Sequence, residues 1–502
     1  MRHPGPNPAI AFVTVWLLVS GGLALAIAPR AIGHDQAWLL DTGRRIVAGE
    51  VLFRDFLDIN SPIVYYLNAV PAAFAAATGT NPIPWFTTLL VLLSAWSALL
   101  ADRALLAISP EARWVERLAL MLVPLGPATV HLTMAEPGQR EHLFVLMYFP
   151  FLIYRVAAAR GTQVGSIAGR FAIGAVAAIG VGLKPHFLIP TICAEAALFL
   201  IARRRRLLIS AEVAGALAAA AACAAALSFL PVDARKNLFE QILPLVKAYG
   251  GRSGWPDVLI IRAGERLAVA ALLAAVAWRA GPSSLRPAVI PLTAFFLGCL
   301  ISTIVQGKAF GYHYIPADAA LCCLAAAAGL GLARGRAAAP VRTALAVAIS
   351  IIVCIWRPLA AESVSRADRY PFRQVLEPHT RSGDSVMVIS TIYVFPVILQ
   401  MDRILVGRQS AFTLAMARHA DATGGRGSAL TARALQEMAD DIRTKQPAAV
   451  FLDRREMFFP TPPGFRVAEF LEADPEIQRA LASYKYAGDT RDFDVFLKRA
   501  GG

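Results

Sequence analysis

The chain has 502 residues, of which 57% are hydrophobic and only 17% are charged, and its mean hydropathy is +0.54. Soluble domains usually carry about a quarter charged residues, so this composition excludes an ordinary soluble protein and favours a membrane protein. The formal net charge of +14 would suit a nucleic-acid-binding protein. However, the arginines occur in short bursts between apolar segments, which is typical of the cytoplasmic loops of membrane proteins.

Apolar stretches long enough to cross a bilayer recur up to about residue 360, since a spanning helix needs roughly 20 apolar residues. The predicted spans lie near residues 9–29, 84–107, 115–135, 140–158, 166–183, 185–202, 207–230, 258–280, 286–306, 312–333 and 338–358. The first span ends in a sequence like a signal-peptide cleavage site, but its apolar run is too long for a signal peptide. We therefore expect it to be retained. The six cysteines lie in apolar spans without metal-ligand spacing, so we expect buried thiols.

The arginine bursts predict the orientation. A cytoplasmic N-terminus places nearly all of the bursts between spans on the cytoplasmic side. Because the number of predicted spans, eleven, is odd, the C-terminal region is then expected on the outer side of the membrane. In a Gram-negative bacterium this side is the periplasm. Residues 62–78 are barely long enough to span, and counting them would move the arginine bursts outside. We therefore expect a helix at the outer membrane interface there.

Residues 361–502 have closely spaced charges and short apolar runs, which predicts a separate soluble α/β domain after a membrane domain of residues 1–360. Short strands are expected at Asp384–Ser390, Arg403–Gly407 and Ala448–Asp453, and a helix at 428–445. This domain has no nucleophile elbow, phosphate-binding loop or zinc pattern. We expect this domain to recognise a substrate that accepts a transferred group, or to pack over a site in the membrane domain.

Polar residues gather in five connections on the predicted outer side, at 33–61, 135–142, 182–186, 231–257 and 306–314. Ionisable groups at membrane depth are costly and indicate function. A solvated rim is the alternative reading. The dense clustering of His, Lys, Arg and acidic residues beside Gly and Pro favours a polar active-site cavity.

These connections contain the short motifs His34-Asp35-Gln36, Gly43-Arg44-Arg45, Gly49-Glu50, Asp55 to Asp58, Asn60-Ser61-Pro62 with Tyr65-Tyr66, and Glu136-Pro137. The motifs resemble those of the GT-C class of membrane glycosyltransferases, in particular protein O-mannosyltransferases and lipid A aminoarabinose transferases. The chain departs from the family at Gln36, where an acid is common, and at Ser61, where Lys or Pro is common. The missing acid leaves a role for a divalent metal open, and the resemblance implies no other cofactor.

The resemblance implies a mainly α fold: a GT-C-like polytopic helical bundle of about 11 spans with a small C-terminal α/β extracytoplasmic domain. It also implies an inverting hexosyl- or pentosyltransferase in the bacterial inner membrane. This enzyme would move a sugar from a polyprenyl-phosphate donor to an envelope glycan, lipid or protein acceptor at the outer face. A nucleic-acid partner is not expected. The main rival is a transporter or flippase of lipid-linked sugars, although no internal repeat is evident. A non-catalytic envelope assembly protein of the same fold is a further alternative.

The acidic candidates follow from this chemistry, which needs a carboxylate to take the acceptor proton. Asp35 is the candidate general base, and Glu136 would position the acceptor or assist that base. Both residues could instead cap helices. Asp55 and Asp58 are weaker candidates for substrate binding, because a turn before Pro62 favours aspartate on local grounds.

The basic and aromatic candidates would hold the donor phosphate, because Arg offers a bidentate fork and Lys a point charge. They are Arg140, Lys184, His186, Lys308, Tyr312 and His313, with His34, His142 and Arg252 as further substrate-binding candidates. Snorkelling to the headgroups is the alternative for Lys184, and an aromatic belt is the alternative for the tyrosine. Residues 231–257 begin like an amphipathic interfacial helix, and their later glycines could let a lid close over the donor.

Overall fold

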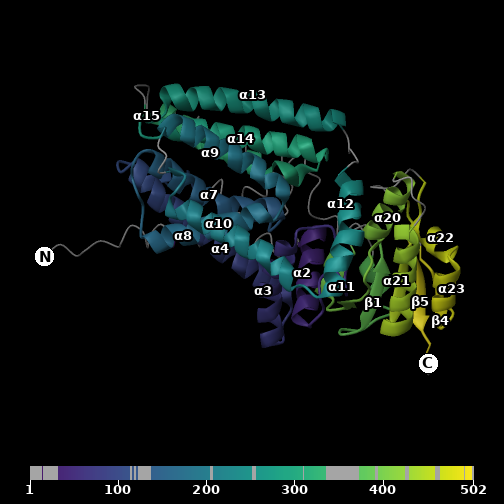
Figure 1. The fold of residues 1–502 in the computed structure, drawn as a ribbon. Coiled ribbons are helices and arrows are strands. Elements are labelled where there is room, and N and C mark those ends of the chain that lie inside the picture. The colour runs from purple at the N-terminus through teal and green to yellow at the C-terminus, as the bar shows by residue number, and fades with distance from the viewer. Residues whose placement is uncertain are drawn as a thin grey trace. The chain divides into compact units, whose positions relative to one another are not determined.

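The computed structural model describes residues 14, 32–112, 116–117, 120–121, 137–203, 207–250, 256–308, 310–334, 372–390, 394–423, 429–457, 464–490 and 492–499. These residues form two compact units, which are described separately (Figure 1). The first unit contains Thr87–Ala225 and Ser253–Val364, and the second contains Ile32–Phe86, Ala226–Arg252 and Ser365–Gly502. The predicted spans near 9–29 and 338–358 and most of 115–135 lie outside the described residues.

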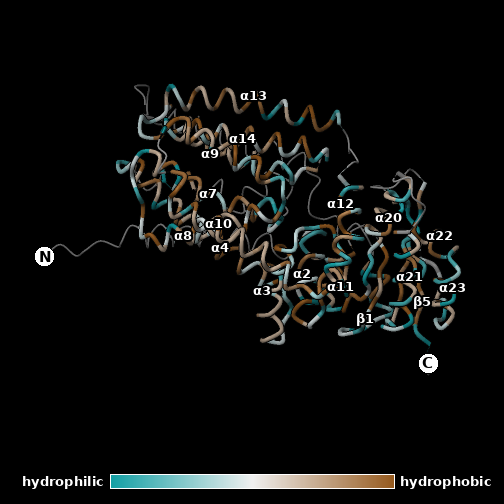
Figure 2. Tube along the Cα trace, viewed as in Figure 1, coloured by the Kyte–Doolittle hydropathy of each residue, from teal (hydrophilic) through white to brown (hydrophobic). Residues whose placement is uncertain are grey.

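The first unit is built from apolar helices, which appear mostly brown in Figure 2. They are α4 (Pro82–Ile108, whose first residues belong to the second unit), α7 (Arg140–Ala159), α8 (Ile167–Gly182), η1 (Pro185–Phe187), α9 (Leu188–Ala202), α10 (Ala211–Ala226), α13 (Pro256–Ala280), α14 (Arg286–Gln306), η5 (Gly311–Tyr314) and α15 (Ile315–Arg334).

Six helical segments of the described part are long and apolar enough to cross a membrane. They are Pro82–Ile108, Arg140–Ala159, Pro185–Ala202, Ala211–Phe229, Arg286–Gln306 and Gly311–Leu332, each at a predicted span. The predicted span 166–183 is the shorter apolar helix α8. The span predicted at 258–280 is α13, which is long but carries Arg262, Glu265 and Arg266 and is not among the six.

Helix α7 forms the centre of the first unit, with every residue from Arg140 to Ala157 buried. Its Phe144 ring stacks on Phe187 of η1 at 4.2 Å, and Tyr148 stacks on Phe295 of α14 at 5.4 Å. Nearby, the Arg155 guanidinium binds the Glu195 carboxylate of α9 at 2.7 Å. Pairing of this kind is needed because an isolated buried charge is very costly in a low-dielectric interior.

The second unit combines helices from early and middle parts of the chain with a C-terminal sheet. Its early and middle elements are α2 (His34–Val47), α3 (Pro62–Thr78), η3 (Leu227–Phe229), α11 (Val232–Asn237), the π-helical turn η4 (Leu238–Ile242) and α12 (Leu243–Gly250). Its C-terminal elements are α18 (Phe372–Leu376), β1 (Ser385–Ile389), α19 (Phe395–Gln400), β2 (Ile404–Leu405), α20 (Ala411–Thr423), α21 (Ala429–Lys445), β3 (Ala449–Asp453), α22 (Val467–Glu472), α23 (Pro475–Leu481), β4 (Tyr484–Asp489) and β5 (Phe493–Lys498).

The sheet has the order β2-β1-β3-β5-β4, in which β2, β1 and β3 are parallel and β5 and β4 are antiparallel to their neighbours. Strand β3 is buried at all five positions, as a central strand covered on both faces must be. The expected mixed α/β character is thus present. The predicted strands and helix correspond to β1, β2, β3 and α21, with β2 reduced to two residues.

Helix α2 packs into the core of this sheet region. Ala37 and Leu40 join a cluster of buried apolar residues that includes Phe395 of α19 and Phe451 of β3. The Arg44 guanidinium also donates a hydrogen bond to the Arg403 carbonyl oxygen at 2.6 Å. Residues that directly follow the first predicted span therefore share one hydrophobic core with the C-terminal strands.

Helix α3 runs from Pro62 to Thr78, as predicted for an interfacial helix, and packs on α2. The two helices approach so closely that a Cβ on Gly43 would lie 2.5 Å from the Asn68 carbonyl oxygen. Only glycine fits that position. The location of α3 relative to a bilayer stays a prediction.

Candidate functional site

The predicted phosphate-binding residues of the first unit lie together in what we term the basic cluster. It consists of Arg140, Glu141, Lys184, His186, Lys308, Tyr312 and His313. Arg140 and Glu141 open α7, where the Gln139 side chain accepts a hydrogen bond from the Arg140 amide. The other members stand at helix ends. Lys184 precedes η1, Lys308 follows α14, and His313 belongs to η5.

The Glu141 carboxylate lies between two basic groups. Lys184 Nζ donates to Glu141 Oε1 at 2.5 Å, and His313 Nε2 lies 3.9 Å from the same oxygen. Lys184 Nζ also lies 3.4 Å from Gln306 Oε1 and 5.5 Å from the centre of the Tyr312 ring. These contacts hold the ammonium group in place at the junction of α7, η1 and η5.

Four members of the basic cluster are buried, and Lys184, His186 and Tyr312 are half-buried. Glu141 is 0% exposed and Lys308 is 2% exposed, and Arg140 is also buried. His313 interacts electrostatically with Lys184, Arg140 and His186, and it forms a hydrogen bond with the backbone of Lys308. The cluster as defined thus combines three permanent cations with one carboxylate, and Arg and Lys are the side chains that commonly bind phosphate.

Glu141 Oε2 and His313 Nδ1 are among the buried polar atoms of the cluster that make no hydrogen bond within the part of the chain that the structure describes. Buried polar atoms are normally satisfied, so such exceptions need an explanation such as a bound group. A ligand hydroxyl that donates to Glu141 Oε2 would satisfy it.

His142 has a local structural contact. Its Nδ1 accepts a hydrogen bond from the Gly138 amide at 3.2 Å, and the residue is 1% exposed. This bond closes the turn that leads into α7. Gly138 adopts a φ of 79°, a conformation that favours glycine.

The second unit holds Asp35 and His34 in the first turn of α2. The N-cap of this helix is Gly33, so Asp35 lies inside the first turn and is not the N-cap. The His34 ring packs on Phe395 with 4.7 Å between ring centres. Burial lowers the pKa of His34, and the negative charge of Asp35 opposes that shift.

Asp55 and Asp58 hold the turn before α3. Asp55 Oδ2 accepts hydrogen bonds from the Val51 amide at 2.7 Å and from Arg54 at 2.9 Å. Burial alone would raise the pKa of Asp55, but these two hydrogen bonds and the positive charges of Arg54 and Lys445 together outweigh it, and the pKa is lowered. Asp58 accepts from the Trp38 indole N–H and, at 2.5 Å, from the Ile59 amide. The contacts of Asp55 thus lie within its own turn, whereas Asp58 combines a turn contact with a hydrogen bond from Trp38 of α2.

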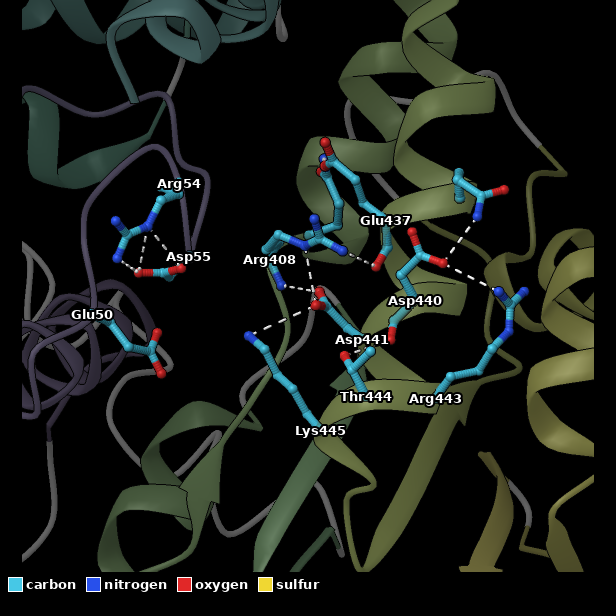
Figure 3. A network of polar contacts seen from close by, with 12 residues as sticks. Glu50, Arg54, Asp55, Arg408, Glu437, Asp440, Asp441, Arg443, Thr444 and Lys445 are labelled. Carbon is cyan, nitrogen blue, oxygen red and sulfur yellow. Dashed lines mark hydrogen bonds and ion pairs between the residues drawn. The ribbon is translucent and has the colours of Figure 1, made fainter. Parts of the chain in front are cut away.

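A second polar network in the same unit was not predicted (Figure 3). Arg408 binds Asp441 of α21 at 3.0 Å, and Lys445 lies 3.8 Å from the same carboxylate. Burial lowers the pKa of Lys445, as does the positive charge of Arg45, while Asp441 opposes the shift. The sequence signal was the acid–base spacing of Asp441 and Lys445, which is common on helix surfaces and therefore weak.

Two candidate residues, Glu136 and Arg252, lie outside the described residues. Glu141, the acid that sits among the cations, was missed as a site residue. Its only signal was its place directly after Arg140 at a predicted span end. In the described part of the chain, no group of three or more His, Cys, Asp or Glu side chains could hold a metal ion.

Comparison with known proteins gives a structural match without a sequence match. No protein-family model matches the chain, and no curated protein matches it. The crystal structure of ArnT from Cupriavidus metallidurans bound to undecaprenyl phosphate superposes with a TM-score of 0.55 at 15% identity, covering 97% of this chain and 99% of that chain. The apo structure of the same ArnT gives a TM-score of 0.53 at 13% identity, covering 96% and 98%.

ArnT is a lipid A aminoarabinose transferase of the GT-C class, one of the families that the sequence motifs resemble. At this level of sequence identity the match supports a conclusion about the fold alone. Over nearly its whole length the chain has the fold of ArnT: a mainly helical, multi-pass GT-C-like membrane protein with a small C-terminal mixed sheet.

Proposed function

We propose that the chain is a GT-C glycosyltransferase that takes its sugar from a polyprenyl-phosphate donor. The observation that carries the proposal is the buried basic cluster, in which Lys184 is held by Glu141 beside further cations. It is supported by the fold, since an ArnT structure of this fold was determined with undecaprenyl phosphate bound.

The basic cluster would bind and stabilise the leaving group, which is the lipid phosphate. As the bond between the sugar and the phosphate breaks, negative charge grows on the phosphate oxygens. Lys184, Arg140 and Lys308 are cations that can stabilise this charge, and a buried setting strengthens each interaction. Lys184 would exchange its bond with Glu141 for one with the phosphate.

Asp35 would act as the general base. It removes the proton from an acceptor hydroxyl, whose oxygen attacks the anomeric carbon as the phosphate departs, so the configuration inverts without a covalent intermediate. The acceptor would be an envelope glycan, lipid or protein.

The orientation is part of the proposal. We infer a cytoplasmic N-terminus and a periplasmic C-terminal region in the inner membrane of a bacterium, because arginine-rich loops stay inside. An alkaline phosphatase fused after Gly502 is active only outside the cytoplasm, so it should be active. A fusion within Arg203–Arg206 should be inactive and serves as the control. The reverse pattern would contradict the orientation.

The decisive experiment compares two lysine variants of the purified protein in nanodiscs. Lys184→Met should weaken binding of undecaprenyl phosphate by roughly 10- to 100-fold, as expected for the loss of a charged hydrogen bond, and should abolish sugar transfer. Lys485→Met changes an exposed lysine of β4 and should alter neither. Equal binding by both variants would contradict the proposal. Movement of the lipid-linked sugar across a vesicle without transfer would favour a flippase.

A further inference from the structure

The segment from Val232 to Gly250 packs against the C-terminal region. It comprises α11, the π-helical turn η4 and α12, and one side of it is fixed to the C-terminal region. Asn237 Nδ2 donates to the Phe53 carbonyl oxygen at 2.6 Å, and Arg433 donates to Asn237 Oδ1 at 2.7 Å. Gln241 donates to Glu437 of α21 at 3.2 Å.

Apolar contacts complete this attachment. Ile242 and Leu245 are buried, and the Tyr249 ring meets Phe412 of α20 edge-on with 5.4 Å between ring centres. Figure 1 shows α12 alongside α20. The side that carries Asn237, Gln241 and Leu245 is therefore a closed internal face.

The opposite side carries an exposed apolar stripe. It consists of Val232, Phe239, Leu243 and Val246, which are 74%, 64%, 47% and 39% exposed. The spacing of about three, four and seven residues places them along one face of a helix. A row of large apolar side chains on one face, including a phenylalanine, marks an interaction surface.

Basic residues border this stripe. Arg235, Lys236 and Lys247 are all exposed: the first two lie between Val232 and Phe239, and Lys247 follows Val246. The segment also has two exposed acids, Asp233 and Glu240, and Lys236 Nζ lies 4.0 Å from the Glu240 carboxylate. An apolar face flanked by Lys and Arg is typical of helices that lie in the headgroup region of a bilayer. There the apolar side chains enter the acyl boundary while the cations contact lipid phosphates.

Chain connectivity brings the stripe to the membrane surface. The candidate span Ala211–Phe229 ends three residues before Val232, a distance of at most about 10 Å along the chain. The headgroup region is roughly 5–8 Å thick on each side of the hydrocarbon core. At its other end, five residues connect Gly250 to Pro256 of α13, at most about 20 Å. Both ends are thus tethered close to apolar helices.

We propose that the stripe of Val232, Phe239, Leu243 and Val246 docks onto the bilayer surface, with Arg235, Lys236 and Lys247 bound to anionic lipid headgroups. The segment would then connect the C-terminal region to the bilayer surface. Its amide-bearing face holds the C-terminal region, and its apolar face rests on lipid. This inference does not depend on the chain being a glycosyltransferase.

Photo-crosslinking tests the proposal on the full chain. Phe239 is replaced by p-benzoylphenylalanine, and the purified protein is reconstituted in vesicles of phosphatidylglycerol and phosphatidylcholine. The matched control carries the same amino acid at the exposed Lys485 of β4. After irradiation, mass spectrometry should find phospholipid attached at position 239 and none at position 485.

The charge contribution is tested in the same assay. In the 239-labelled chain, Arg235→Glu with Lys236→Glu should lower the yield of phosphatidylglycerol adduct relative to phosphatidylcholine adduct. A crosslinked dimer at position 239 would instead identify a second copy as the occupant and overturn the proposal. Equal lipid adduct at positions 239 and 485, or none at either, would overturn it as well.

Discussion

Lys184 and Glu141 form a buried ion pair 43 residues apart in the sequence, in which Lys184 Nζ donates to Glu141 Oε1 at 2.5 Å. The Glu141 side chain is 1% exposed and the Lys184 side chain 12%. The second carboxylate oxygen of Glu141 has no hydrogen-bond partner among the described residues. A carboxylate in this position competes with any phosphate for the ammonium group.

Glu141→Gln should therefore tighten the binding of undecaprenyl phosphate while lowering the turnover of sugar transfer. The neutral amide no longer competes for Lys184, and the lipid phosphate product leaves more slowly. The dissociation constant and kcat, measured on the same nanodisc sample, check this expectation. Glu111→Gln, at an exposed position of the same unit, is the control. Weaker phosphate binding in Glu141→Gln would argue against a shared site.

Asp35→Asn should reduce kcat by roughly 100- to 10,000-fold, the usual contribution of a general base. The amide has the same shape but cannot take the acceptor proton. Binding of undecaprenyl phosphate should stay unchanged, because the proposed mechanism has Asp35 act on the acceptor and not on the donor. Asp55→Asn offers a contrast, since Asp55 accepts from the Val51 amide and Arg54. It should lower thermal stability more than kcat. Full turnover in Asp35→Asn would remove Asp35 from the mechanism.

Asp318→Asn should destabilise the first unit by about 3–5 kcal/mol, because it leaves the buried Arg266 without its counter-charge. In the native chain two hydrogen bonds of 2.8 and 2.9 Å join these side chains, and the Arg266 guanidinium lies 3.8 Å from the centre of the Tyr314 ring. The double variant Arg266→Met with Asp318→Leu should recover most of the loss, since replacing a buried pair by apolar groups is nearly neutral.

Thermal unfolding in detergent micelles measures this difference. Arg286→Met, at an exposed arginine of α14, should have little effect and serves as the control. A double variant as unstable as the single one would show that the charges themselves, and not their pairing, are required.

The stability of the second unit should depend on pH through His34. Its pKa is lowered from 6.5 by burial, so between that lowered value and 6.5 the unfolded chain binds a proton that the folded chain does not. The stability that neutral His34 contributes is therefore present above pH 6.5 and is lost as the pH falls. The difference in unfolding temperature between the native chain and His34→Gln should grow from pH 5 to pH 7. A difference independent of pH would contradict the burial of a neutral ring.

The sequence alone determined the membrane helices, because about 20 apolar residues in a row are a local signal that needs no partner. The helix at 62–78, the strands at 385–389 and 449–453 and the turn aspartates Asp55 and Asp58 were predictable for the same reason. Turn chemistry and strand composition act over a few residues. The motifs also indicated the GT-C class, which agrees with the fold of ArnT.

Only the tertiary structure decided which distant residues meet. The pairing of Glu141 with Lys184, and the burial of Ala37 and Leu40 of α2 against Phe451 of β3, join residues dozens to hundreds of positions apart. The apolar residues of α2 would equally suit a membrane-interface helix. The hydropathy of a helix shows that its apolar face must be removed from water, but it does not show whether protein or lipid covers that face. The reason is that the free energy of burial is non-directional and scales with apolar area.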